Sequence, residues 1–186
     1  MSRGGTLPRR RRAFIGCEGE SEQGYVAWLR RTIDADQRNL HLDAVLLKPG
    51  AGDPLRMVDL ACALMRERER KRGPYRWRAV LLDADRRDEA PGGRAELQSR
   101  ARQHGLRLLW QEPNHEAMLL RHLPDCETLR PATAAAVHAR LRRHWPDYAK
   151  PMSANDLAAR LDATSLRRAI RVEAELAVFL RDLGFT

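Results

Sequence analysis

The residues best suited to chemistry are acids placed where apolar segments end. The apolar run 79–82 stops at Asp83-Ala84-Asp85, and the run 13–17 stops at Glu18. If the strand stays extended through Asp85, the two aspartates share a face about 6.6 Å apart. Carboxylates placed in this way suit Mg²⁺, which binds through one or two carboxylates, water and substrate phosphates.

An isolated Asp-x-Asp triplet is more often a solvated turn or a helix cap than a metal site. The joint position of Asp83, Asp85 and Glu18 at the ends of separate apolar runs favours the site. A cation there could orient a water nucleophile and stabilise charge during phosphodiester cleavage. Glu18 could complete the cation site or act as a general base, and the residues alone leave both roles open.

Alternating strands and helices must position these acids. Apolar runs predict strands at 11–17, 42–47, 76–82 and 106–110. One helix is predicted to begin at Ser21, which would be its N-cap. Further helices are predicted at 53–72, 94–104, 132–144, 155–161 and 164–183. This alternation predicts an α/β fold with a mainly parallel four-stranded sheet, because parallel neighbours need helix-length crossovers. Ligands of such sheets bind beyond the carboxyl ends of the strands.

The predicted organisation has three parts along the chain. Residues 1–10 are expected to form a flexible basic arm, with Gly4, Gly5 and Pro8 opposing regular structure. Residues 11–125 form the α/β domain. Residues 126–186 read as helical only, and we expect them to cap and pack on the same domain.

Charge and composition limit the kinds of partner that the protein is expected to bind. The 34 Lys and Arg against 25 Asp and Glu give a formal charge of +9, which favours an acidic partner, first of all nucleic acid. Arg-rich genome composition is the alternative explanation. No apolar run approaches the roughly 18 residues that span a membrane, and no signal-peptide pattern follows the basic start, so we expect a cytoplasmic protein without a membrane partner. The three scattered cysteines predict buried, reduced thiols.

Several motifs together resemble a known family. Glu18-Gly19-Glu20-Ser21-Glu22-Gln23-Gly24-Tyr25, followed by Asp83-Ala84-Asp85, resembles the Toprim fold, which includes the OLD-type nucleases. The chain is more closely similar to the RloB-like family, through the segment 112–122 and through Tyr148-Ala149-Lys150. It departs from that family at Pro113-Asn114, where the order is reversed, and at His115 and Met118, which replace aromatic residues.

The resemblance implies a Toprim-like phosphoryl-transfer site that uses Mg²⁺ or Mn²⁺. Glu18 would act as acid or base, with Asp83 and Asp85 as metal ligands. It also implies a setting in bacterial anti-phage defence, where related proteins act as nucleases on phage or host nucleic acid.

Further residues join the candidate site. Glu116 is predicted to be catalytic, although a first-turn acid also stabilises a helix through its dipole. Lys150 could meet a phosphate or a transition-state anion, or be a solvated loop lysine. The remaining candidates are the nucleic-acid contacts Lys48, Arg86 and Arg87 and the accessory residues Glu22 and Asn114.

The sequence therefore predicts a metal-dependent endonuclease that cleaves RNA or DNA in anti-phage defence. The alternative is a nucleic-acid-binding or regulatory partner protein with a non-catalytic Toprim-like site. A third reading is another phosphoryl transfer at the same site. A partner protein of the defence system is also expected, while the oligomeric state stays open.

Overall fold

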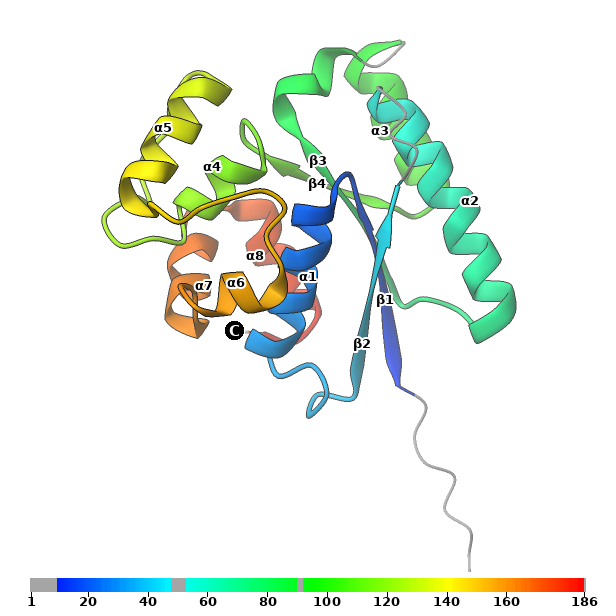
Figure 1. The fold of residues 1–186 in the computed structure, drawn as a ribbon. Helices are drawn as coiled ribbons and strands as arrows, with labels where there is room; N and C mark the ends of the chain where they lie inside the picture. The colour runs from blue at the N-terminus through cyan, green and yellow to red at the C-terminus, as the bar shows by residue number, and fades with distance from the viewer. Residues whose placement is uncertain (1–9, 48–52, 90–91, 186) are drawn as a thin grey trace, which may run out of the picture.

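Four parallel strands form one open sheet at the centre of the protein (Figure 1). The structure, a computed structural model, describes residues 10–47, 53–89 and 92–185. The strands are β1 (Arg11–Cys17), β2 (Leu40–Leu46), β3 (Trp77–Asp83) and β4 (Arg107–Gln111). They lie in the order β2-β1-β3-β4, and every pair is parallel. The predicted α/β class and four-stranded parallel sheet are confirmed.

Helical crossovers connect the strands and cover both faces of the sheet. Helix α1 (Glu20–Thr32) links β1 to β2 on one face, whereas α2 (Pro54–Arg72) and α3 (Gly93–Gln103) lie on the other (Figure 1). The chain moves outward from β1 to β2 and then returns to place β3 on the opposite side of β1. The strand order therefore switches between β1 and β3, where open α/β sheets bind their ligands.

The two faces of the sheet explain the continuous apolar runs in the sequence. Ala13 and Ile15 belong to the core beneath α1, and Phe14 between them belongs to the core beneath α2 and α3. Side chains alternate between faces along a strand, so a strand buried on both faces must be apolar throughout.

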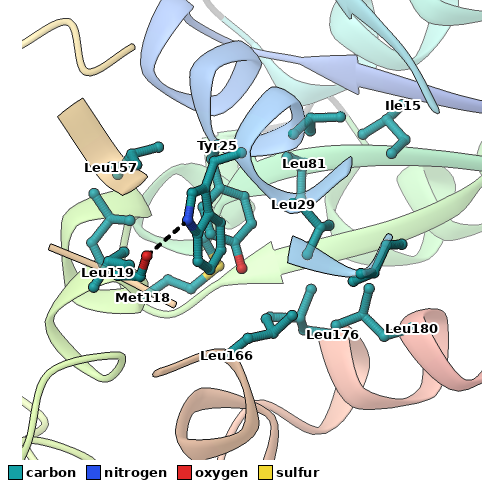
Figure 2. Close-up of a cluster of buried hydrophobic side chains, with 14 of the residues drawn as sticks. Ile15, Tyr25, Leu29, Leu81, Met118, Leu119, Leu157, Leu166, Leu176 and Leu180 are labelled. Carbon is teal, nitrogen blue, oxygen red and sulfur yellow. Dashed lines mark hydrogen bonds between the residues drawn. The ribbon is translucent and has the colours of Figure 1, made fainter. Parts of the chain in front are cut away.

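Five helices follow β4 and lie on the α1 side of the sheet (Figure 1). They are α4 (His115–Leu120), α5 (Ala134–His144), α6 (Ala154–Ala158), α7 (Ala163–Ile170) and α8 (Ala174–Asp182). Leu157, Leu166 and Leu176 from these helices share one buried cluster with Ile15 and Leu29 (Figure 2). The C-terminal helices and the sheet thus have a common hydrophobic core.

Three local predictions differ from the structure. The single helix expected over 164–183 is divided into α7 and α8, because Glu173 leaves the helix to pair with the fully buried Arg121. Helix α1 begins after Gly19 rather than Ser21, since the Glu22 carboxylate accepts a hydrogen bond from the Gly19 N–H. The loop expected after β3 contains the 3-10 helix η1 (Ala84–Glu89).

Two further observations concern the cysteines and the apolar character of the helices. The three cysteines are buried and form no disulfide. No helix in the described part of the chain combines the length and apolar character that a membrane span requires.

Candidate functional site

A cleft of about 380 Å³ opens at the carboxyl ends of β1 and β3, where the strand order switches. Its walls come from the β1–α1 turn, the end of β3, the start of α4 and the loop between α5 and α6. The lining residues are Glu18, Gly19, Glu20, Ser21, Glu22, Asp83, His115, Lys150 and Pro151. Carboxylates therefore face a lysine across a small polar cleft.

Asp83 is the last residue of β3 and contributes one wall of the cleft. Its Oδ1 accepts a hydrogen bond of 2.8 Å from the backbone N–H of His115, at the start of α4. Burial raises the pKa of Asp83 to about 8, and the negative charges of Glu22, Glu18 and Asp85 contribute to this shift. The carboxylates are thus near enough to repel one another, and a bound cation would relieve that repulsion.

The β1–α1 turn supplies the other acids of the cleft. Glu18 follows β1 directly and is half-buried. Glu22 is buried, and its Oε2 accepts the Gly19 N–H at 3.0 Å. Burial raises the pKa of Glu22, while the Gly19 N–H and the positive charge of Lys150 partly offset that rise. The positive charge of Lys150 therefore acts on the acidic side of the cleft.

Lys150 is held in place by a buried carboxylate outside the cleft lining. Its Nζ forms an ion pair with Oε1 of Glu116, and the Tyr148 hydroxyl donates to the same oxygen at 3.2 Å. The Lys150 side chain remains 58% exposed, whereas that of Glu116 is only 6% exposed. Glu116 thus positions Lys150, which presents its charge to the cleft.

The loop carrying Lys150 is also anchored on α1, at Gly24. A Cβ atom at Gly24 would collide with the carbonyl oxygen of Met152, two residues beyond Lys150. A glycine inside a helix costs about 1 kcal/mol relative to alanine, so its presence here is explained by this close approach. Helix α1 therefore supports both the acidic turn and the Lys150 loop.

His115 lies at the inner end of the cleft with a defined protonation state. Its Nδ1 lies 2.7 Å from the side-chain nitrogen of Gln111. Burial lowers the pKa of His115 to about 3. The ring is consequently neutral near pH 7 and adds no positive charge beside Asp83.

The donor chemistry of the cleft fits a hydrated Mg²⁺ or Mn²⁺. Within residues 10–47, 53–89 and 92–185, no three His, Cys, Asp or Glu side chains are grouped as a complete metal site. Mg²⁺ does not require such a cage, because one or two carboxylates with water and phosphate oxygens satisfy it. Asp83 and Glu18 provide that number of hard oxygen ligands.

Sequence comparison places the chain in a family. The family profile described as RloB-like protein matches residues 13–180, from β1 to α8. The chain belongs to the RloB-like family. No curated protein and no solved structure matches it significantly.

In this RloB-like chain, the cleft gathers four of the predicted site residues. Glu18, Glu22 and Asp83 form the acidic side, and Lys150 lies opposite them. They come from the β1–α1 turn, the end of β3 and the α5–α6 loop. The parallel sheet brings the first three together, and the C-terminal helices deliver the fourth.

Asp85 occupies a different position from the one expected for an extended strand. The N–H groups of Ala84 and Asp85 both donate to the carbonyl of Pro113, at 2.8 and 2.9 Å. The chain therefore turns into η1 directly after Asp83, and the exposed Asp85 does not line the cleft. Its charge still contributes to the raised pKa of Asp83.

Asn114 and Arg87 do not line the cleft. Asn114 is the N-cap of α4, where its Oδ1 accepts the Ala117 N–H at 3.1 Å, so its side chain has a structural role. Arg87 pairs with Glu112 at 2.9 Å and covers the ring of Trp110. Lys48 and the Arg86 side chain lie outside the described residues.

Two residues at the site were not predicted from the sequence. Gly24 could have been noticed as a glycine within a helical pattern, although its contact with Met152 is not a sequence feature. His115 was noted only as a departure from the aromatic residue of the family, and not as a site residue. Its hydrogen bond to Gln111 depends on the β4–α4 turn and required the structure.

Proposed function

We propose that this RloB-like protein hydrolyses phosphodiester bonds of RNA or DNA with Mg²⁺ or Mn²⁺ bound in the cleft. The observation that carries the proposal is the convergence of Glu18, Glu22 and Asp83 opposite Lys150 at the strand-order switch. The raised pKa of Asp83 supports it, since neighbouring carboxylates contribute to the shift. Perturbed acids gathered in a cleft are typical of functional sites.

Asp83 and Glu18 are the proposed ligands of the cation. When bound, the cation would supply positive charge for the scissile phosphate and lower the pKa of the attacking water. Lys150 would bind a non-bridging phosphate oxygen, because its side chain is exposed and lines the cleft. Glu116 would keep Lys150 in that position and would not touch the substrate.

Two acids can serve as the proton acceptor. Glu18 is the residue that the family resemblance implies, and Glu22 lies in the same turn. Burial raises the pKa of Glu22, which makes its carboxylate a better proton acceptor than an exposed one. Separate Glu18→Gln and Glu22→Gln variants would assign the role, because loss of the base removes the low-pH limb of the pH–rate profile, where cleavage speeds up as the base loses its proton.

The proposed setting is anti-phage defence in the bacterial cytoplasm, with phage or host nucleic acid as substrate. This setting rests on membership of the RloB-like family. A partner protein of the defence system would supply the activating signal.

The alternative is a nucleic-acid-binding or regulatory protein with a non-catalytic site. It is favoured by the ion pair that already engages Lys150 with Glu116 and by the charge of +9, which attracts nucleic acid without chemistry. Under this alternative the protein would bind RNA or DNA but never cleave it.

A cleavage assay distinguishes the two functions. End-labelled RNA and DNA strands are incubated with the protein in Mg²⁺, Mn²⁺ or EDTA. We expect metal-dependent products, and a loss of at least about 100-fold in Asp83→Asn and Glu18→Gln. Asp147→Asn, which removes an exposed carboxylate, should retain activity. Cleavage that persists in both site variants would refute the proposed site.

A further inference from the structure

Helix α5 presents an uncompensated basic surface. Between Glu127 and Asp147 the chain has no acidic residue, yet it contains four arginines and two histidines. Arg140, Arg142 and Arg143 of α5 are exposed, while the helix buries only Val137 and Leu141. We call these three arginines the α5 basic face.

Several basic residues on the other helices have carboxylate partners. Among the described residues, none of the three arginines of the α5 basic face forms an ion pair with a carboxylate. By contrast, Lys71 on α2 pairs with Glu67 at 2.6 Å, and Arg100 on α3 pairs with Asp59 at 2.9 Å. The helix dipole favours cations in the last turn, which accounts for Arg142 and Arg143 but not for the absence of acids along the whole segment.

Helix α5 contacts the residues that hold Lys150 through His138, a neighbour of these arginines in the helix. The ring of His138 packs edge-on against Tyr148, with 6.2 Å between centroids, and Tyr148 donates to the Glu116 carboxylate that holds Lys150. Arg142 lies one turn after His138 and therefore on the same side of the helix. Figure 1 shows α5 beside α4, with the loop after α5 passing to the start of α1.

We propose that the α5 basic face binds the phosphate backbone of the nucleic acid whose scissile phosphate enters the cleft. That the nucleic acid is a substrate rests on the proposed function, whereas binding by α5 does not. Guanidinium groups pair with phosphate through two hydrogen bonds and are weakly hydrated. The face has no aromatic platform, so it would contact the backbone rather than the bases and tolerate many sequences.

The salt dependence of binding tests this surface. Affinity for a fluorescent 20-nucleotide single-stranded RNA, and for the DNA of the same sequence, is measured by anisotropy in EDTA, where cleavage is absent. Each lost phosphate contact lowers the slope of log K against log[salt] by about 0.7 on a single strand. We therefore expect the Arg140→Gln/Arg142→Gln/Arg143→Gln variant to lose about 2 from this slope and to bind about 10- to 100-fold more weakly near 0.1 M salt.

A matched control separates this surface from overall charge. Arg30→Gln/Lys71→Gln/Arg100→Gln removes the same charge from residues that are paired with carboxylates. We expect this control to change the slope by less than about 1. Equal losses in both triple variants would overturn the proposal, as would an unchanged slope in the α5 variant. If the α5 variant retained RNA and DNA binding but lost binding to phosphatidylserine vesicles, the proposal would also be overturned, in favour of a membrane-binding surface.

The same assays separate this inference from the proposed function. Wild-type protein that binds with the expected slope but never cleaves in Mg²⁺ or Mn²⁺ would remove the proposed function and leave the α5 basic face supported. Wild-type protein that cleaves, with an α5 variant of unchanged KM and unchanged affinity, would overturn the α5 inference alone. Circular dichroism melting checks that both triple variants are folded.

Discussion

Replacing Asp83 with asparagine should change how stability depends on pH. Asparagine keeps the shape of the side chain and an oxygen that can accept the His115 N–H, but it removes the titrating group. In the folded protein Asp83 keeps its proton up to about pH 8, whereas its ordinary pKa is 3.8. Between these values the unfolded chain binds fewer protons, so the stability of the wild type falls as pH rises.

The magnitude follows from the two pKa values. A tenfold change in proton concentration corresponds to about 1.4 kcal/mol, so the interval from 3.8 to about 8 sets an upper limit of about 6 kcal/mol. Water in the open cleft reduces this value, and we expect about 2–4 kcal/mol. The free energy of unfolding of Asp83→Asn, relative to wild type, should therefore rise by this amount between pH 4 and pH 8 and then level off.

Urea unfolding at several pH values measures this difference. Asp147→Asn, which removes an exposed carboxylate, should follow the wild type within about 0.5 kcal/mol throughout. At pH 8, Mg²⁺ at 100 times its dissociation constant should stabilise the wild type by about 2.7 kcal/mol and Asp83→Asn by much less. A difference curve that is flat between pH 4 and pH 8 would refute the reasoning that Asp83 is buried among other carboxylates.

Two further predictions concern the Lys150 loop. Gly24→Ala should destabilise the protein by about 1–3 kcal/mol in urea unfolding, despite the better helix propensity of alanine, because the new methyl group would collide with the Met152 carbonyl; a gain in stability would contradict this contact. Glu116→Gln should reduce kcat/KM for cleavage by about 10-fold, since Lys150 loses its charged anchor. The ¹³C-methyl NMR signal of dimethylated Lys150, one of only three lysines, should shift in that variant while the signals of Lys48 and Lys71 stay in place.

The sheet could be predicted from the sequence because its two central strands are apolar on both faces, β1 over residues 13–17 and β3 over residues 79–82. The strand expected over 11–17 agrees with β1, and the helix expected over 53–72 agrees with α2, whose N-cap is Asp53. The elements that differ from the prediction do so because of particular hydrogen bonds and ion pairs. The Pro113 carbonyl turns the chain after Asp83, and the pairing of Glu173 with Arg121 interrupts the last predicted helix.

The position of the acidic half of the site could be predicted from the sequence, whereas Lys150 was a candidate through the family resemblance and its position opposite the acids depends on tertiary contacts. Glu18 and Asp83 follow strands, so the parallel topology alone predicts that they share an edge of the sheet. Lys150 follows no strand, and its place depends on Glu116, Tyr148 and the approach of Met152 to Gly24. Contacts between segments so distant in the chain leave no periodic pattern to read.

A crystal soaked in Mn²⁺ tests the central claim most directly, because anomalous scattering locates the ion without assumptions about activity. We predict a peak in the cleft within direct coordination distance of oxygen atoms of Asp83 and Glu18, and no such peak in Asp83→Asn. A peak bound elsewhere, or an empty cleft at Mn²⁺ concentrations that saturate cleavage, would contradict it.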